Sequence, residues 1–189
     1  RSLPLTKTGY LRRKLKTAEN QRRAKELMDD NTLLKYMYFA FRGGNTICNH
    51  WRMGAVIENV HSWDITSAYL AAMYFCKYPT AKFERTKEPW QNMAWVAKVK
   101  IKGLLLKRYL EPAPYLAMGR RQKWVNPYTI NGRVVGASEA IIYITDIDYK
   151  IIERQYQWES FEFLDCYQSE YSFLPVDITD LVLDLFFDK

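Results

Sequence analysis

The sequence predicts an α+β fold in which helices accompany a mixed or antiparallel sheet. Apolar and polar side chains alternate over residues 94–101 and again over 158–167, a pattern typical of half-buried strands. Apolar residues recur at helical spacing over residues 175–186, which indicates an amphipathic helix. With 189 residues and 48% hydrophobic residues, the chain can bury the core of one domain, or of a domain with an inserted subdomain.

The first 75 residues are expected to hold three helices and two or three strands. Residues 6–28 form a helix with a narrow apolar stripe, whose many Lys and Arg side chains favour phosphate contact and a solvated helix face about equally. The remaining elements follow in order: a helix over 33–41, strands over 46–50, 55–60 and 61–65, and a helix over 67–74.

The rest of the chain reads as strands and helices around two irregular regions. Residues 80–92 form a polar loop, and residues 102–137 are rich in Pro and Gly. In the second region basic residues are interleaved with aromatic ones, which fits a nucleic-acid-facing insertion and equally a β-rich loop with scattered surface charge. The regular elements are strands over 94–101, 140–145 and 158–167, a helix over 147–156 capped by Thr145 or Asp146, and the helix at 175–186.

Charge is unevenly distributed along the chain. The formal net charge is +7 at pH 7, yet from Asp146 onward eleven acidic residues stand against three basic ones, a local charge of −8 that leaves +15 on the rest. A basic body indicates a polyanionic partner, although a solvated basic surface gives the same composition. Aromatic residues make up 15% of the chain, which suits a surface that stacks on bases as well as a core.

Nothing in the sequence indicates a membrane or secretory segment. No apolar run approaches the ~20 residues needed to span a bilayer, and no signal-peptide pattern opens the chain. The three cysteines are far apart and form no Cys-x-x-Cys pair, so reduced thiols are expected. We therefore expect a cytoplasmic protein with no membrane partner.

Phe41-Arg42-Gly43-Gly44 is the first stretch that indicates chemistry. Two adjacent glycines permit positive φ and close approach of another chain, and Arg42 places a cation beside exposed N–H groups. This arrangement is a reasonable cradle for a phosphodiester backbone, although on local grounds alone an ordinary helix end followed by a hairpin is favoured.

The second such stretch runs from Ser62 to Leu70 and contains Asp64. Asp64 is expected between a strand and a helix, where a carboxylate projects past the sheet edge and meets a cation without being buried. A helix N-cap is the structural alternative for Asp64, since a carboxylate ahead of Thr-Ser-Ala-Tyr accepts backbone N–H bonds. A core aromatic is the alternative for Tyr69.

Together these stretches resemble the polymerase region of family B DNA polymerases, most closely the protein-primed group of phages and related elements. Phe41-Arg42-Gly43-Gly44 is similar to the Tyr-x-Gly-Gly motif of that family. Some twenty residues later, Asp64-Ile65-Thr66-Ser67-Ala68-Tyr69 is similar to motif A, D-x-x-S-L-Y-P. Residues 140–168 resemble the strand–helix–strand that leads toward the fingers. The spacing of the first two motifs is more specific than either motif alone.

The resemblance implies a partial polymerase palm plus a β-rich insertion, in three parts. Residues 1–78 would be early palm with the Gly-Gly and motif A segments. Residues 79–139 would be the palm insertion, which in the protein-primed enzymes contacts the terminal protein. Residues 140–189 would lead to the start of the fingers.

The chain also departs from the family pattern. Phe41 replaces Tyr, Ala68 stands where Leu is common, and Leu70 stands where Pro is usual. The Asp-Thr-Asp of motif C, motif B and an exonuclease Asp-x-Glu segment are absent from the sequence. We therefore expect an internal fragment, inactive by itself, of a DNA-directed DNA polymerase. The alternative is a non-catalytic nucleic-acid-binding module on a polymerase-like scaffold.

Site roles follow from the resemblance residue by residue. Asp64 is implied as a catalytic residue and, with the backbone carbonyl of Ile65, as a ligand of two Mg²⁺ ions, which the intact enzyme uses and the fragment would not retain. Tyr69 resembles the steric gate that excludes ribose, and Ser67 the residue that places the template or the nucleotide. The implied DNA contacts are Phe41, Arg42, Gly43 and Gly44.

The partners that the resemblance implies are a DNA template-primer, dNTPs and, in a protein-primed system, a terminal priming protein. The reaction implied is two-metal phosphoryl transfer during replication of viral or mobile-element DNA. If a phage encodes the enzyme, the cytoplasm is that of the host.

Overall fold

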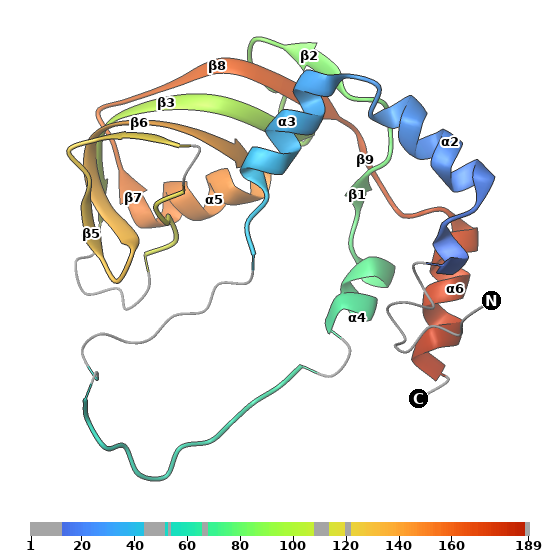
Figure 1. The fold of residues 1–189 in the computed structure, drawn as a ribbon, viewed down its shortest axis with the longest axis horizontal. Helices are drawn as coiled ribbons and strands as arrows, with labels where there is room; N and C mark the ends of the chain where they lie inside the picture. The colour runs from blue at the N-terminus through green and yellow to red at the C-terminus, as the bar shows by residue number, and fades with distance from the viewer. Residues whose placement is uncertain are drawn as a thin grey trace. The chain divides into compact units, whose positions relative to one another are not determined.

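A computed structural model of the chain describes residues 13–43, 52, 54–65, 68–107, 114–119 and 122–187. The chain forms two compact units, each assembled from pieces that are distant in sequence (Figure 1). The larger unit comprises Asn31–Val60 and Glu84–Gln168. The smaller unit comprises Arg1–Asp30, His61–Phe83 and Ser169–Lys189. Each unit is described by itself.

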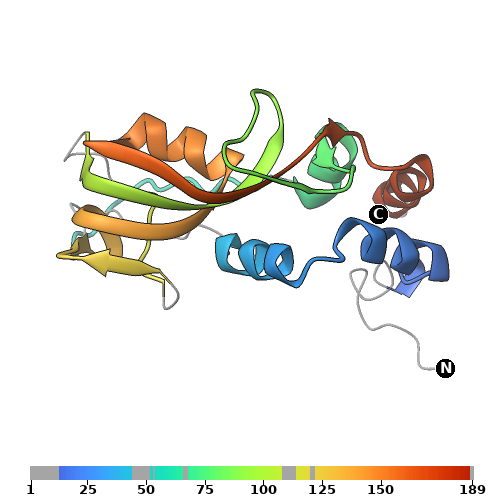
Figure 2. The ribbon, with the colours of Figure 1, turned by 90° about the horizontal axis from the view of Figure 1, so that it is seen from above.

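The larger unit is built on a seven-stranded sheet. The strand order is β2-β8-β3-β6-β4, with β5 added to β6 and β7 added to β3. Seen from above in Figure 2, β8 in red-orange, β3 in green and β6 in orange lie side by side. The strands are β2 (Glu84–Thr86), β3 (Ala94–Leu106), β4 (Lys123–Val125), β5 (Tyr128–Ile130), β6 (Arg133–Thr145), β7 (Tyr156–Gln157) and β8 (Ser160–Ser169).

The long strands β3 and β6 hold the centre of this sheet. They pair antiparallel from Val96 opposite Thr145 to Leu105 opposite Gly136. Because side chains alternate between the two faces of a strand, every second residue turns toward helix α5 (Asp146–Gln155), over which the strands curve in Figure 1. The fully buried apolar side chains on this face and on α5 are Ala97, Val99, Ile101, Ala140, Ile142, Ile144 and Ile152.

Helix α5 begins with a complete capping box. The Thr145 hydroxyl accepts a hydrogen bond from the backbone N–H of Asp148 at 3.2 Å, and the Asp148 carboxylate accepts one from the backbone N–H of Thr145 at 2.8 Å. Two otherwise unpaired N–H groups are thereby satisfied. The predicted helix over 147–156 and its cap at Thr145 are confirmed.

Helix α3 (Asn31–Ala40) covers the other face of the sheet at one end. It buries Leu33, Tyr36 and Ala40. The Tyr36 ring packs edge-to-face on that of Tyr143, 5.0 Å between centroids. Tyr143 alternates with the core residues Ile142 and Ile144, so it points away from α5. The predicted helix over 33–41 is thus confirmed, and its apolar stripe packs on the sheet.

Two side chains donate hydrogen bonds to the Asp165 carboxylate on β8. Arg85 donates from Nε and Nη2 at 2.8 and 3.0 Å, and the Tyr36 hydroxyl donates at 2.8 Å. Partial burial opposes ionisation of the Asp165 carboxyl, but the hydrogen bonds from Arg85 and Tyr36 outweigh it and hold its pKa below the usual value.

Asp165→Asn is expected to lower the free energy of unfolding by about 1–2 kcal/mol at pH 7. A carboxyl whose pKa is depressed in the folded state stabilises the fold above its unfolded-state pKa of about 4, and this contribution is lost as pH falls through the folded-state pKa. The variant should therefore lose less stability than the parent chain on acidification below about pH 4. Urea unfolding over this range measures the difference, with exposed Glu84→Gln as the control. Identical acid sensitivity of Asp165→Asn and the parent chain would contradict the assignment.

A tight turn joins β5 to β6. Asn131 and Gly132 both have positive φ, 49° and 71°, the combination that a two-residue type I′ hairpin requires. The irregular region predicted over 102–137 is therefore wrong in part, because it contains the end of β3, strands β4 and β5 and the start of β6.

The smaller unit contains helices α2 (Ala18–Leu27), α4 (Ala68–Phe75) and α6 (Val176–Phe187), and strand β1 (Tyr78–Pro79) paired with β9 (Tyr171–Ser172). Helix α4 packs against α6. Arg23 on α2 pairs with Glu19 at 2.6 Å and with Asp177 of α6 at 3.4 Å. These partners are solvent-exposed, so each pair contributes less than about 1 kcal/mol.

Residues 54–65 form no strand, contrary to the strands predicted over 55–60 and 61–65. Gly54 and Asn59 have positive φ, which interrupts an extended conformation. Val56 is 93% exposed, so its apolar side chain has no partner strand or core to pack on. The strand predicted over 46–50 lies outside the described residues, as does the start of the helix predicted over 6–28. Within the part of the chain that is described, no helix has both the length and the apolar character needed to cross a bilayer.

Candidate functional site

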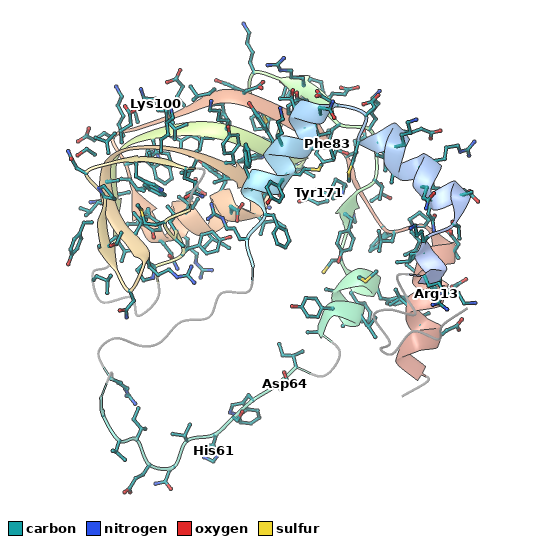
Figure 3. The ribbon with its side chains drawn as sticks, viewed as in Figure 1. Arg13, His61, Asp64, Phe83, Lys100 and Tyr171 are labelled. Atoms are coloured by element: carbon teal, nitrogen blue, oxygen red, sulfur yellow. The ribbon has the colours of Figure 1, made fainter. Side chains whose placement is uncertain are left out.

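Asp64 lies on the chain segment that leads into α4, as Figure 3 shows. Its side chain is exposed, and among the described residues no hydrogen bond or ion pair engages its carboxylate. The following residue, Ile65, is 76% exposed, and Trp63 before it is 92% exposed. The local structure thus presents one free carboxylate between exposed apolar neighbours. Ser67, the predicted template or nucleotide contact, lies outside the described residues.

Tyr69 is on the first turn of α4 and is 87% exposed. That exposure disfavours the alternative of a core aromatic, because a core ring is shielded by its neighbours. Asp64 and Tyr69 therefore belong to the same unit and offer, within six residues, a carboxylate and an accessible aromatic ring.

The oxygens of this segment fit half of a divalent-metal site. Mg²⁺ prefers carboxylate, carbonyl and water oxygens, and Asp64 with the Ile65 carbonyl would offer two such ligands. Among the described residues, however, no group of three or more His, Cys, Asp or Glu side chains comes close enough to hold a metal ion. A pair of ions would need a further carboxylate beside Asp64.

The Phe41–Gly43 segment follows α3 in the larger unit. Phe41 ends the helix through its N–H, which donates to the Met37 carbonyl at 2.9 Å, and its side chain is 79% exposed. A Cβ added to Gly43 would meet no described atom within 4 Å, so another chain could approach it closely. Gly44 lies outside the described residues.

Arg42 is largely buried, unlike its neighbours, with 19% of its side chain exposed. Its Nε lies 3.4 Å from the Asp148 carboxylate without the alignment of a hydrogen bond, and its Nη2 donates to the Tyr143 carbonyl at 3.4 Å. Its guanidinium also stacks on the Tyr115 ring, 5.5 Å from the centroid. Arg42 thus ties the chain entering Gly43 to the start of α5.

Tyr115 completes this cluster by donating its hydroxyl to the Asp148 carboxylate. Burial and this hydrogen bond raise the pKa of Tyr115 well above its usual value, so the hydroxyl stays protonated and continues to donate. Sequence analysis missed Asp148 and Tyr115 as partners of Arg42. The only available signal was the Thr145-x-x-Asp148 capping box, which places Asp148 at a helix start but does not point to Arg42.

No protein-family model matches the sequence, and no curated protein matches it. Solved structures do match. Phi29 DNA polymerase complexed with primer-template DNA and incoming nucleotide substrates matches over 94% of this chain and 31% of its own, with a TM-score of 0.69 and 16% identity. An orthorhombic crystal form of Phi29 DNA polymerase gives a TM-score of 0.68 at 15% identity over the same shares. Its complex with single-stranded DNA gives 0.58 at 13% identity, over 93% of this chain and 33% of that one.

At these identities the likeness is one of fold, and it bears on the predictions made from sequence. The chain spans about a third of the length of the polymerase that it matches. Helices with antiparallel strand pairs confirm the α+β class. The resemblance to a protein-primed family B DNA polymerase is confirmed as well: the chain has the fold of one part of Phi29 DNA polymerase.

Proposed function

We propose that this chain is part of a DNA-directed DNA polymerase that adds dNTPs to a primer during replication of viral or mobile-element DNA. The observation that carries this proposal is the match of 94% of the chain to a polymerase bound to primer-template DNA and incoming nucleotides. The proposal is also supported by the spacing of about twenty residues between the Gly-Gly pair and Asp64, and by the exposure of Asp64.

In this proposal the chain has three functional parts. Residues 1–78 carry the early palm with the Gly-Gly and motif A segments, residues 79–139 the palm insertion, and residues 140–189 the approach to the fingers. A terminal priming protein would be the partner of the insertion if priming is by protein.

Asp64 is the proposed catalytic carboxylate. Bound Mg²⁺ ions supply Lewis-acid activation of the phosphate and of the primer hydroxyl. Asp64, with the Ile65 carbonyl, would hold such ions at an exposed point of the chain, where neither oxygen must first be released from a protein partner. The further carboxylate that this chemistry requires is not among the described residues around Asp64, so the isolated chain is expected to be inactive.

The nucleotide and DNA contacts are assigned to the motif residues, of which Phe41 and Tyr69 are exposed. Tyr69 would lie beneath the deoxyribose of the incoming dNTP and exclude a 2′-hydroxyl, with Ser67 beside it. Phe41 and the Gly43–Gly44 pair would lie against the DNA backbone; the side chain of Phe41 is exposed and the space beside Gly43 is open. Arg42 would act mainly by holding that segment in place, because its guanidinium is already engaged by Asp148 and Tyr143.

Tyr69→Val in the full-length protein is expected to raise incorporation of ribonucleotides relative to deoxyribonucleotides by about tenfold or more. Valine lacks the ring that would meet the 2′-hydroxyl, whereas the rest of the site is unchanged. Primer extension with single dNTPs and rNTPs gives the two kcat/KM values, and Tyr74→Val on the same helix is the matched control. An unchanged ratio would refute the gate, and a full-length protein unable to extend a primer would overturn the proposed function.

The second candidate is a non-catalytic nucleic-acid-binding module. The observation in its favour is the lone carboxylate: no metal-binding cluster accompanies Asp64 in the described part of the chain. The same primer-extension measurement separates the two candidates, since a binding module would retain DNA without extending it.

A further inference from the structure

One face of β3 carries three lysines in succession. Lys98, Lys100 and Lys102 alternate with Val99 and Ile101, which are fully buried on the side of α5. The lysines therefore point to the opposite face of the sheet. Figure 3 shows Lys100 at the outer side of the curved strands, away from α5.

Strand β4 adds a fourth lysine to the same face. Lys123 pairs with Ile141 of β6, and Ile141 pairs on its other side with Lys100. Paired residues of neighbouring strands share a face, so Lys100 and Lys123 flank Ile141. Alternate residues on a strand are ~7 Å apart and neighbouring strands ~4.8 Å apart, which places the four residues in a patch of roughly 14 by 10 Å. We call Lys98, Lys100, Lys102 and Lys123 the lysine face.

Positive charge is in excess on this face. Glu139 forms an ion pair with Lys100 at 3.0 Å. Within the described part of the chain, the other three lysines form no ion pair. Glu162 on β8 alternates with core-packed aromatic residues and so lies on the lysine side, and Glu159 lies close over Gly103. Asp165 also lies on the α3 side, but Arg85 pairs with it, and the four lysines outnumber the other three carboxylates.

The Gly43 segment meets β6 near one end of the lysine face. Tyr143 is paired with Lys98 across β3 and β6, and its carbonyl accepts the hydrogen bond from Arg42. The open residue Gly43 follows Arg42 directly. Gly43 and the lysine face belong to the same unit of the structure.

We propose that the lysine face binds the phosphodiester backbone of DNA. Protein–protein interfaces are depleted in lysine and centred on apolar side chains, whereas backbone contacts to nucleic acid are made by Lys and Arg regardless of sequence. Here the charged groups are spread along a strand, and the apolar residue between them, Ile141, is half-buried. This assignment rests on the proposed nucleic-acid function but not on catalysis.

The test replaces the three unpaired lysines by glutamine, in Lys98→Gln/Lys102→Gln/Lys123→Gln. Fluorescence anisotropy with a labelled primer-template DNA gives Kd at several salt concentrations. Loss of three phosphate contacts should reduce the slope of log Kobs against log salt by about 2.7, and weaken binding about tenfold or more at low salt. The matched control removes three exposed cations of the same unit that are not on β3 or β4, namely Lys87, Lys150 and Arg154.

A second variant should act in the opposite direction. Glu139→Gln removes the ion-pair partner of Lys100 and one negative charge, so it should tighten DNA binding and increase the salt slope by up to about 1. Because every substituted side chain is at the surface or half-buried, thermal melting should show the same fold in all variants.

Three results would overturn the proposal. One is an unchanged Kd in the triple variant, another is an equal loss in the control triple, and the third is competition by polyglutamate as strong as that by DNA, which would indicate an acidic protein partner. Primer extension by the full-length protein is scored separately. If the triple variant still extends a primer and its DNA affinity is unaltered, DNA binding by the lysine face is refuted, whereas the proposed polymerase function is not.

Discussion

Asp64→Asn in the full-length protein is expected to lower kcat for primer extension by about 10³-fold while leaving the Kd for primer-template DNA nearly unchanged. Asparagine keeps the size of the side chain but removes the charge that would hold the metal ions. Loss of one such electrostatic contact to a transition state costs about 10²–10³ or more in rate, and 10³-fold corresponds to about 4 kcal/mol.

The structure makes this a clean substitution. The Asp64 side chain is exposed, and no described residue bonds to it, so the change removes no contact that stabilises the fold. A loss of activity would therefore report on chemistry and not on unfolding, which thermal melting of the variant would verify.

Exposed Glu58→Gln, six residues earlier, is the matched control and should retain full activity. A raised Mg²⁺ requirement in Asp64→Asn would support the ligand role. Activity within about twofold of the parent enzyme would contradict it, and the Asp64 assignment would then have to be abandoned.

Asp148→Ala is expected to lower the free energy of unfolding of this chain by about 3–5 kcal/mol. The Asp148 side chain is 8% exposed. Its carboxylate accepts hydrogen bonds from the Thr145 N–H in the α5 cap and from the Tyr115 hydroxyl, and it forms an ion pair with the Arg42 guanidinium. Its removal leaves a largely buried arginine without a counter-charge, which is the costly way to break an ion pair. Against a total stability of about 5–15 kcal/mol this loss is large.

Urea unfolding measures the loss, and exposed Glu88→Ala is the control for removing a carboxylate from the same unit. A double-mutant cycle with Arg42→Met separates the pair from the cap. Coupling of about 1–3 kcal/mol is expected, because once Arg42 is gone Asp148 retains only the cap and Tyr115. Additive effects of Arg42→Met and Asp148→Ala would show that the two side chains do not act together.

The sequence predicted those helices and strands that are determined by residues within or next to the segment itself. Helix α5 was predicted because Thr145 caps it, and β3 because its apolar residues alternate. Strands over 55–65 were predicted from the same kind of pattern and are absent, because a strand needs a partner and Val56 has none. The β5–β6 hairpin was overlooked although Asn131-Gly132 indicates it.

In the candidate site, too, some features agree with the sequence prediction and others could not be predicted. The exposure of Asp64 and Tyr69 agrees with the roles that their motif implies, which stay predictions. The burial of Arg42 could not be foreseen, since its partners Tyr115 and Asp148 come from distant parts of the sequence and meet it only in the folded sheet. Sequence patterns indicate which residue types are available but not which of them are already occupied by one another.

The division of the chain into interleaved units also sets an order of assembly during synthesis. All pieces of the larger unit have been made once the ribosome reaches Gln168, whereas the smaller unit still awaits β9 and α6. At translation rates of about 5–20 residues per second, these last elements follow roughly 1–4 s later. A nascent chain would thus carry a finished lysine-lined sheet before α4, the helix after Asp64, meets its packing partner α6. Of the two units, the one that contains the carboxylate proposed for catalysis is therefore completed later.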